Sequence, residues 1–385
     1  MHHNIRLLKI FNFLIGFSLF APLAIIYFSK VSGSYTLGAS IFGITMLSSA
    51  IFEVPTGIWS DMVGRRGTII LGSWARVMAF VLYAIGFSYW WLVAGAILEG
   101  ISRSFYSGNN DAFLHDTLAD ASQVSEYHVY LGKVSASEHI GIAISAILGG
   151  IIASYSFTYV MWLSVIPQFL LALMSHLFID PKTHSNTDTN IYVHLKDAIR
   201  LFLTNKKIRA LSIADAISFS TGEVSFKFRA TFFSSIWPLW AIGLLNTTLQ
   251  FGASASYYFS DKLIKKMGYE KLLVIRSIVG KVSNFIAFGI PSIFSPLITI
   301  FPSFLYGAGQ VAKNTLMQRE FTQQQRATMS SLNSLISNIA FFLVSILLGW
   351  YSDQYGPRVA LLWLTVIALP IIWIYWDIFN KKDTQ

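Results

Sequence analysis

Residues 57–67 read GIWSDMVGRRG: an apolar run ends at Ser-Asp and is followed by a glycine and two arginines. Related segments occur at 258–268, YFSDKLIKKMG, and at 349–359, GWYSDQYGPRV. Each joins a Ser-Asp pair at the end of an apolar run to a nearby glycine and basic residues. The three segments close the second, eighth and eleventh apolar runs of the chain. This spacing indicates a unit of three helices that is repeated four times.

Apolar runs account for most of the chain. Of its residues, 54% are hydrophobic and 12% are charged, whereas about 25% are charged in a soluble domain. A helix needs roughly 20 residues to cross the hydrocarbon core. The runs of that kind are 7–29, 36–60, 68–88, 90–117, 132–155, 157–179, 208–233, 237–260, 271–290, 295–318, 328–352 and 357–378. The sequence therefore predicts an all-α membrane protein with twelve transmembrane helices.

The longest polar break, residues 180–207, separates two groups of six runs. We expect an N-terminal bundle at 1–180, a cytoplasmic linker at 181–207 and a C-terminal bundle at 208–385. Within the linker, a short amphipathic piece at 193–203 is predicted to lie on the membrane surface. The first run exceeds the apolar core of a secretory signal, so we expect it to be retained as a spanning helix.

The net charge of +9 does not indicate nucleic-acid binding, because the basic residues form no patch. They concentrate in alternate breaks between the runs. If both termini are cytoplasmic, the outer breaks contain only Lys30 and Arg358. By the positive-inside rule, this asymmetry predicts that both termini are cytoplasmic. With no cysteine and no metal-ligand spacing among the histidines, we expect neither a metal site nor a cofactor.

The segment at 57–67 resembles the motif between the second and third helices of the major facilitator superfamily of transporters. The matching residues are Gly57, Asp61, Gly64, Arg65 and Arg66. The resemblance implies two pseudo-symmetric six-helix bundles. It also implies that Asp61 meets the start of the eleventh helix near Thr328, and that Arg65 pairs with Asp116. Such a gating cluster would lock the cytoplasmic ends of the bundles together, the alternative being a topology anchor without gating.

The predicted fifth helix contains GIAISAILGG at 141–150, which partly resembles a motif of the family's proton-driven antiporters. Gly141, Gly149 and Gly150 match that motif. Ser145 and Ala146 stand where the motif has Gly-Pro. The small residues predict close packing with a neighbouring helix, and the replaced Gly-Pro pair argues against antiport.

Ionisable and polar side chains recur every fourth residue of the predicted fourth helix. They are Glu99, Arg103, Ser107, Asp111 and His115. Successive members differ by about 40° on a helix, so they form a slowly winding stripe. A charge at the bilayer centre costs on the order of 3 kcal/mol, so this stripe requires an aqueous or protein-lined face. We interpret it as part of a transport pathway, although Glu99 and Arg103 are as well explained by a buried structural pair.

The seventh and tenth predicted helices carry similar residues. Those on the seventh are Asp215, Glu223, Lys227 and Arg229, and those on the tenth include Tyr306, Gln310, Lys313 and Asn314. Helices one, four, seven and ten are equivalent members of the repeats, and in the family they line the central cavity. Glu53, which has no cation nearby in sequence, is a further candidate to carry a proton, the alternative being a hydrogen bond to a neighbouring helix.

These features predict a secondary transporter rather than an enzyme. No nucleotide-phosphate loop is present, so direct use of ATP is not supported and we expect an ion gradient to supply the energy. The titratable carboxylates, and the lack of a pattern typical of a sodium site, favour protons. On the pathway helices, the cations Arg103, Lys227, Arg229 and Lys313 outnumber the carboxylates expected near mid-membrane, which are Glu99 and Glu223. This balance favours an anionic or amphipathic small molecule. The overall pattern resembles the bacterial efflux-type members of the family, so the first hypothesis is export of a drug-like compound or metabolite. The same resemblance implies a monomer in the bacterial cytoplasmic membrane. The alternatives are uptake of an organic anion such as a siderophore, and a transporter-like sensor that moves nothing.

Overall fold

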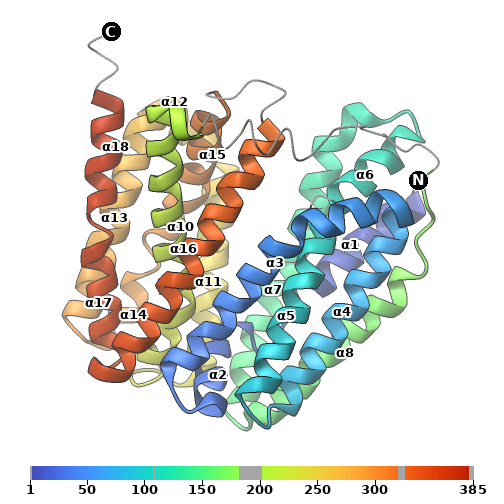
Figure 1. Cartoon of the computed structure of the whole chain (residues 1–385). Helices are drawn as coiled ribbons and strands as arrows, with labels where there is room; N and C mark the ends of the chain where they lie inside the picture. The colour runs from blue at the N-terminus through green and yellow to red at the C-terminus, as the bar shows by residue number, and fades with distance from the viewer. Residues whose placement is uncertain (1, 108, 182–201, 320–325, 381–385) are drawn as a thin grey trace. The chain divides into compact units, whose positions relative to one another are not determined.

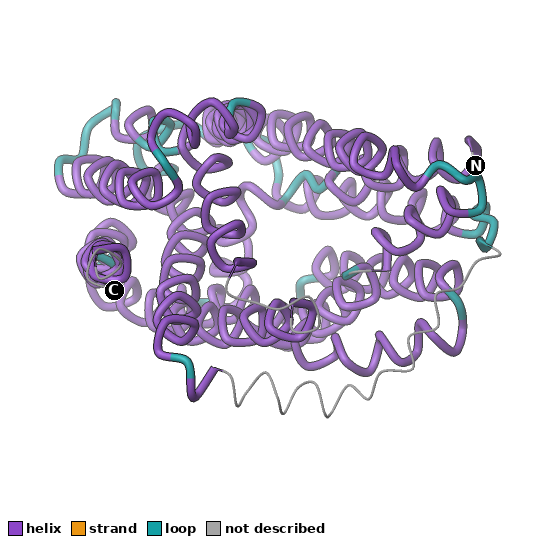
Figure 2. Tube along the Cα trace, turned by 90° about the horizontal axis from the view of Figure 1, so that it is seen from above, coloured by secondary structure: helices purple, strands orange, loops and turns teal. Residues whose placement is uncertain are grey.

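The computed structural model describes residues 2–107, 109–181, 202–319 and 326–380. In this part of the chain every regular element is helical and no strand occurs (Figure 2). The chain forms two compact units. Unit 1 comprises Met1–Asp188 and Pro238–Thr247, and unit 2 comprises Thr189–Trp237 and Thr248–Gln385. Most of the expected linker, with nearly all of its amphipathic piece, lies outside the described residues.

Unit 1 contains most of the N-terminal elements (Figure 1). They are α1 (His2–Gly16), η1 (Ala21–Leu23), α2 (Ala24–Ser32), α3 (Tyr35–Val63), α4 (Arg65–Ile85), α5 (Tyr89–Tyr106), α6 (Asn109–Ala119), η2 (Val124–Glu126), α7 (Tyr127–Ala153), α8 (Phe157–Ser175) and the first half of α11 (Leu239–Tyr258). Helices α3 and α4 both pack against α5, while α1 packs against α7 and α4 against α8.

Unit 2 contains the second half of α11 and the remaining helices. They are α10 (Lys206–Phe233), α12 (Ser260–Met267), α13 (Tyr269–Gly289), α14 (Ser295–Ile298), α15 (Ser303–Arg319), α16 (Arg326–Tyr355), α17 (Pro357–Ile367) and α18 (Pro370–Asn380). Helix α10 packs against α16, α17 and α18, and α13 packs against α15, α17 and α18. The polar helices α10 and α15 therefore belong to the same unit.

Among the described residues, eight helices are long and apolar enough to cross a membrane. The expected spans that fall outside this set are 90–117, 208–233, 237–260 and 295–318. Three of these four are the spans to which the sequence assigned polar stripes. Charged and amide side chains lower their hydropathy, and α15 has only 17 residues. Hydropathy alone therefore misses the helices that carry most of the candidate site.

Several spans expected to be continuous helices are interrupted. The span 7–29 breaks after Gly16, and the span 90–117 breaks between Tyr106 and Asn109. The spans 237–260, 295–318 and 357–378 likewise include a helix boundary. Proline explains part of this, because it cannot donate to the preceding turn: Pro370 begins α18. The stripe on the fourth span is accordingly divided, with Glu99 and Arg103 on α5 but Asp111 on α6.

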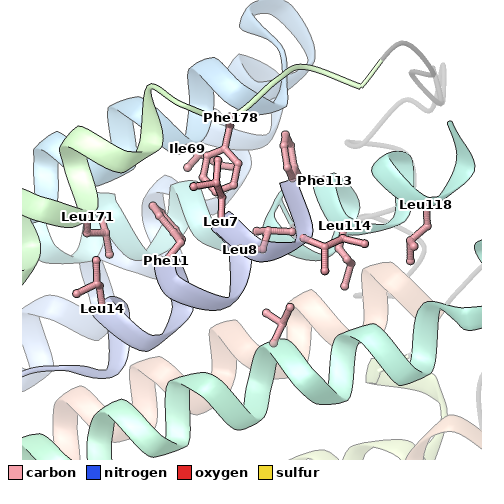
Figure 3. Close-up of a cluster of buried hydrophobic side chains, with 12 residues drawn as sticks. Leu7, Leu8, Phe11, Leu14, Ile69, Phe113, Leu114, Leu118, Leu171 and Phe178 are labelled. Atoms are coloured by element: carbon pink, nitrogen blue, oxygen red, sulfur yellow. The ribbon is translucent and has the colours of Figure 1, made fainter. Parts of the chain in front are cut away.

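An apolar cluster fixes α6 against α1 in unit 1 (Figure 3). Leu8 and Phe11 of α1 are completely buried and pack with Phe113 of α6 and with Phe178, which follows α8. The rings of Phe11 and Phe113 each meet Phe178 edge to face, at centroid distances of 5.5 and 5.1 Å. Burial of rings this large dominates the energetics of such a contact. It places the neighbouring Asp116 beside the junction of α3 and α4.

Candidate functional site

The three repeated Ser-Asp segments share one backbone turn. Gly64, Gly268 and Gly356 have φ of +83°, +76° and +83°, with ψ of 164°, 158° and 155°. This region is essentially restricted to glycine. Each glycine ends one helix by donating its N–H to a carbonyl four residues earlier, and its own carbonyl accepts from the residue four positions later. The sequence repeat is thus a repeated connection between consecutive helices.

Arg65 and Asp116, expected to pair, lie close together in unit 1. Arg65 Nε is 3.6 Å from Asp116 Oδ2, and the Asp116 side chain is almost completely buried. Arg65 Nη1 also donates to Ser60 Oγ at 3.2 Å, and Ser60 Oγ donates to Asn109 Oδ1 at 2.9 Å. Asn109 Nδ2 completes the circuit by donating to the Arg65 carbonyl at 3.1 Å. Ser60 and Asn109 were not anticipated, and they connect the α3–α4 junction to α6.

The other residues of the expected gating cluster are placed differently. The Arg66 N–H donates to Asp180 Oδ1 at 3.1 Å and its Nη2 to the His176 carbonyl at 2.8 Å, so Arg66 binds the segment after α8. A Cβ at Gly57 would meet no described atom within 4 Å. The side chains of Asp61 and Thr328 lie outside the described residues.

Glu99 connects α4 to α5. Tyr83 Oη donates to Glu99 Oε2 at 2.8 Å, and Arg103 Nε lies 3.3 Å from Glu99 Oε1. The Glu99 side chain is 15% exposed and that of Arg103 is 42% exposed. The pair of Glu99 and Arg103 considered from the sequence is therefore formed, with the cation directed toward accessible space.

Asp111 and Glu53 are not brought into this network by any described contact. Asp111 is exposed in the first turn of α6, where a carboxylate is favourable beside the N-terminal N–H groups. Glu53 is half-buried on α3, and no described cation lies within ion-pair distance of it. Asp111 therefore has a sufficient structural explanation, whereas Glu53 does not.

A buried arginine that the sequence analysis did not identify lies at the centre of unit 1. Arg76 of α4 donates from Nε to Gln168 Oε1 at 2.6 Å and from Nη2 to the Ile15 carbonyl at 2.8 Å. Its guanidinium also lies 5.0 Å from the ring centroid of Phe80. Gln168 of α8 is fully buried and donates from Nε2 to the Leu14 and Phe17 carbonyls, at 3.3 and 3.1 Å. Arg76 and Gln168 thus satisfy carbonyls at the end of α1.

Helix α7 completes the surroundings of this break. Ser145 Oγ donates to the Gly16 carbonyl at 3.4 Å, so side chains of α4, α7 and α8 all reach the end of α1. A Cβ at Gly141 or Gly149 would collide with the backbone carbonyls of Phe13 and Leu19. The close packing predicted from the small residues is therefore confirmed. The serine that replaces the motif's glycine supplies a hydrogen bond to the broken helix.

In unit 2, Asp215 and Lys313 form an ion pair that joins α10 to α15. Lys313 Nζ lies 2.7 Å from Asp215 Oδ1, and their side chains are 17% and 13% exposed. Such a pair is costly to break on one side, because the remaining charge is left in a poorly solvated place. The sequence identified both residues as candidates but did not connect them.

Glu223 and Arg229 of α10 lie near each other in the same unit. Arg229 is buried, feels the charge of Glu223, and places its guanidinium 4.2 Å from the ring centroid of Phe226. Lys227 is half-buried one turn after Glu223. On α15, Gln310 is half-buried beside the Tyr306 hydroxyl, while Asn314 is exposed.

Outside the spans, Asp261 in the second repeated segment pairs within its own helix. Its Oδ2 lies 2.7 Å from Lys265 Nζ, and this hydrogen bond raises the pKa of the exposed Lys265 ammonium. Among the described residues, no group of three or more His, Asp or Glu side chains is arranged to bind a metal ion. The site chemistry available in the described residues is therefore that of ion pairs, phenols and amides.

Comparison with known proteins gives matches to transporters. A family model described as Major Facilitator Superfamily matches residues 7–345. The chain is similar to the class B tetracycline resistance protein of Escherichia coli, with 28% identity over 163 residues that cover 40% of this chain and 39% of that protein. It is also similar to the uncharacterized MFS-type transporter YxaM of Bacillus subtilis (strain 168), with 20% identity over 393 residues, covering 96% and 94%. The chain spans 48% or less of the length of the first three curated relatives that it matches.

Among solved structures, a mutant of the nucleoside transporter NupG superimposes with a TM-score of 0.83 at 12% identity. The match covers 97% of this chain and 99% of that one. At such identity the likeness concerns the fold alone. The expected all-α membrane fold is confirmed, and both relatives and fold are those of transporters rather than enzymes.

Proposed function

Because the chain belongs to the Major Facilitator Superfamily, we propose that it is a proton-coupled secondary transporter that exports a drug-like compound or metabolite by alternating access. It acts as a monomer in the bacterial inner membrane, with both termini in the cytoplasm. The bundles that alternate are residues 1–180 and 208–385, joined by the linker 181–207.

The contacts of Glu99 carry the proposal of proton coupling. Its carboxylate accepts a hydrogen bond from Tyr83 at 2.8 Å and lies 3.3 Å from Arg103 Nε, on α5 within the expected span 90–117. Protonation of Glu99 removes the charge that attracts Arg103. The guanidinium, already 42% exposed, is then released to a substrate. One protonation step can in this way change the binding properties of the pathway.

The cytoplasmic gate is formed by the cluster around the α3–α4 junction. Its members are Gly57, Asp61, Gly64, Arg65, Arg66 and Asp116. The contact between Arg65 Nε and Asp116 Oδ2 measures 3.6 Å, longer than a hydrogen bond, and the buried Oδ2 accepts none from the described residues. A carboxylate in that condition gains a full hydrogen bond when its partner moves closer, which suits a contact that forms and breaks during transport.

Similarity to proteins named for tetracycline resistance supports export of a drug-like compound. The second candidate is uptake of an organic anion together with a proton. Release of Arg103 by protonation of Glu99 favours it, because the freed guanidinium can bind the anion, and the proton on Glu99 is then carried inward together with that anion. Ser145, in place of the antiporter motif's glycine, is consistent with this candidate as well.

The test uses inside-out membrane vesicles whose interior is acidified by respiration, with a fluorescent probe of lumenal pH. Tetracycline and a panel of drug-like compounds are added one at a time. We expect at least one compound to raise the lumenal pH in wild-type vesicles. The Glu99→Gln variant keeps an acceptor for Tyr83 but cannot exchange a proton, and we expect it to give no response. Glu126→Gln, in the exposed η2 turn, is the matched control and should respond like wild type.

Failure of every compound in vesicles that contain folded protein would exclude export of this class. Right-side-out vesicles with labelled organic anions would then test uptake. A compound response that persists in Glu99→Gln would retain transport but remove Glu99 as the proton carrier, and Glu53 would be the next carboxylate to replace.

A further inference from the structure

Helix α13 carries two cations well inside one of the eight apolar spans, besides Lys271 near its start. Arg276 and Lys281 lie within Tyr269–Gly289, and no described carboxylate lies within ion-pair distance of either. Each also feels the other's charge, so the two repel. Ionisable residues within the bilayer are expensive and are found where function requires them. The cost of this arrangement calls for an anion that is not part of the described chain.

Arg276 extends across the neighbouring helix α15. A Cβ at Gly309 would collide with Arg276 Cδ and would lie 2.8 Å from Nη1 and 3.0 Å from Nε. The arginine stem therefore occupies the space that a side chain at Gly309 would fill. Beyond it, the guanidinium lies 4.9 Å from the ring centroid of Tyr306, a member of the polar register on α15. A residue from α13 thus reaches the polar face of α15.

The surroundings of the guanidinium are rich in hydrogen-bond donors. Tyr257 meets Tyr306 edge to face, with ring centroids 6.4 Å apart, and the charge of Arg276 acts on both phenols. The charge of Glu223 also acts on both phenols, but Glu223 does not come within ion-pair distance of Arg276. A guanidinium stacked on an aromatic ring keeps its edge N–H groups available, and these match a planar oxyanion in two-point contact.

We propose that Arg276 and Lys281, assisted by the hydroxyls of Tyr257 and Tyr306, bind a carboxylate or phosphate group. The group belongs either to the transported solute, an assignment that rests on the proposed transport function, or to the head group of an anionic lipid. Gly309 is a specificity-determining position, because its missing side chain lets Arg276 reach the anion.

The experiment measures binding to the purified chain in detergent, without a proton gradient. Benzoate and glucose 6-phosphate serve as anionic probes, with glucose and tetraphenylphosphonium as neutral and cationic comparators at constant ionic strength. The readout is thermal unfolding followed by the fluorescence of the 11 tryptophans. We expect a saturable rise in melting temperature with at least one anion and none with the comparators. Arg276→Gln and Lys281→Gln should each weaken that binding about tenfold or more, as loss of a charge-assisted contact requires.

Two further variants separate position from charge. Gly309→Ala keeps both cations but obstructs the arginine stem, so it should weaken anion binding as well. Gly280→Ala on α13 is the matched control, because a Cβ there meets no atom within 4 Å, and it should bind like wild type. In a parallel arm, the chain is placed in nanodiscs of phosphatidylcholine with or without phosphatidylglycerol, and retained lipid is measured by mass spectrometry.

Soluble anion binding that depends on Arg276 and Lys281 would identify a solute site. Phosphatidylglycerol retention with the same dependence, but no effect of soluble anions, would identify a lipid site. If the glutamine variants elute as folded protein and bind both probes and lipid like wild type, the proposal is wrong. Because no gradient is used, this outcome is independent of the Glu99 experiment: binding can persist where coupled transport fails.

Discussion

Gly64 combines φ of +83° with ψ of 164°, a backbone conformation that costs an L-residue on the order of 1–3 kcal/mol. We therefore expect Gly64→Ala to lower the thermal stability of the chain in detergent by that amount. Gly132 on α7 is the matched control, since it is helical and a Cβ there would meet no atom within 4 Å. Gly132→Ala should be neutral or stabilising by up to about 1 kcal/mol. Equal melting temperatures for the two variants would contradict the strained turn.

Single residues also differ in whether the sequence could predict their place in the site. Glu99, Asp215 and Glu223 were identifiable, because charges at four-residue spacing in an apolar run require a non-lipid face. Arg76 and Gln168 could not be found in this way. Neither has an ionisable side chain three or four positions away in its helix, and the two are separated by 92 positions in the chain. Only the fold brings such residues together, so no local sequence pattern predicts them.

At the scale of the helix, the break that follows α1 is stabilised by side chains of three other helices, α4, α7 and α8. Arg76→Met would leave the Ile15 carbonyl and the Gln168 amide oxygen without their donor, and each buried unsatisfied group costs about 1–3 kcal/mol. We expect a lower melting temperature and faster amide hydrogen exchange at residues 14–20. Lys30→Met, at the exposed end of α2, removes a charge without a buried contact and should change stability by no more than about 0.5 kcal/mol.

A double-variant cycle sharpens that expectation. Arg76 and Gln168 act on the same break, so Arg76→Met combined with Gln168→Leu should cost less than the sum of the single changes. Strict additivity, or exchange at residues 14–20 that does not respond to Arg76→Met, would show that the break is stable without this brace.

The same break was missed from sequence because apolar residues continue through it. Residues 7–29 satisfy the length and hydropathy of a single span, and Pro22 was the only strong local signal. The break between Tyr106 and Asn109 was also missed, since the four-residue register of polar side chains continues across it. The bilayer requires an apolar run that is long enough to cross it. Whether the helix in that run is continuous depends instead on whether side chains can bind the backbone carbonyls that a break leaves without intrahelical partners.

At the scale of the whole molecule, the composition was sufficient to predict the class of protein, and the motif at 57–67 was sufficient to predict the family. A chain with 54% hydrophobic residues in runs of about 20 has few alternatives to a helical membrane protein. The three repeated Ser-Asp segments also share one backbone turn in the structure, at Gly64, Gly268 and Gly356. The boundary between the two compact units could not be predicted from composition or from the motif. Residues 238–247 are contiguous in sequence with helices of unit 2, yet they pack in unit 1. Packing of that kind depends on small residues such as Gly243 meeting α7, not on composition.

The distribution of basic residues makes a prediction about the whole chain in the membrane. Translocating a basic loop is unfavourable, and the breaks expected inside contain nearly all of the loop lysines and arginines. Alkaline phosphatase becomes active only where its disulfides form, in the periplasm. We expect an insertion after Gly33, between α2 and α3, to be active, and an insertion after Ser122, between α6 and α7, to be inactive. The reverse pattern, in chains shown to be inserted and intact, would invert the proposed orientation and place the Arg65–Asp116 contact on the outer side.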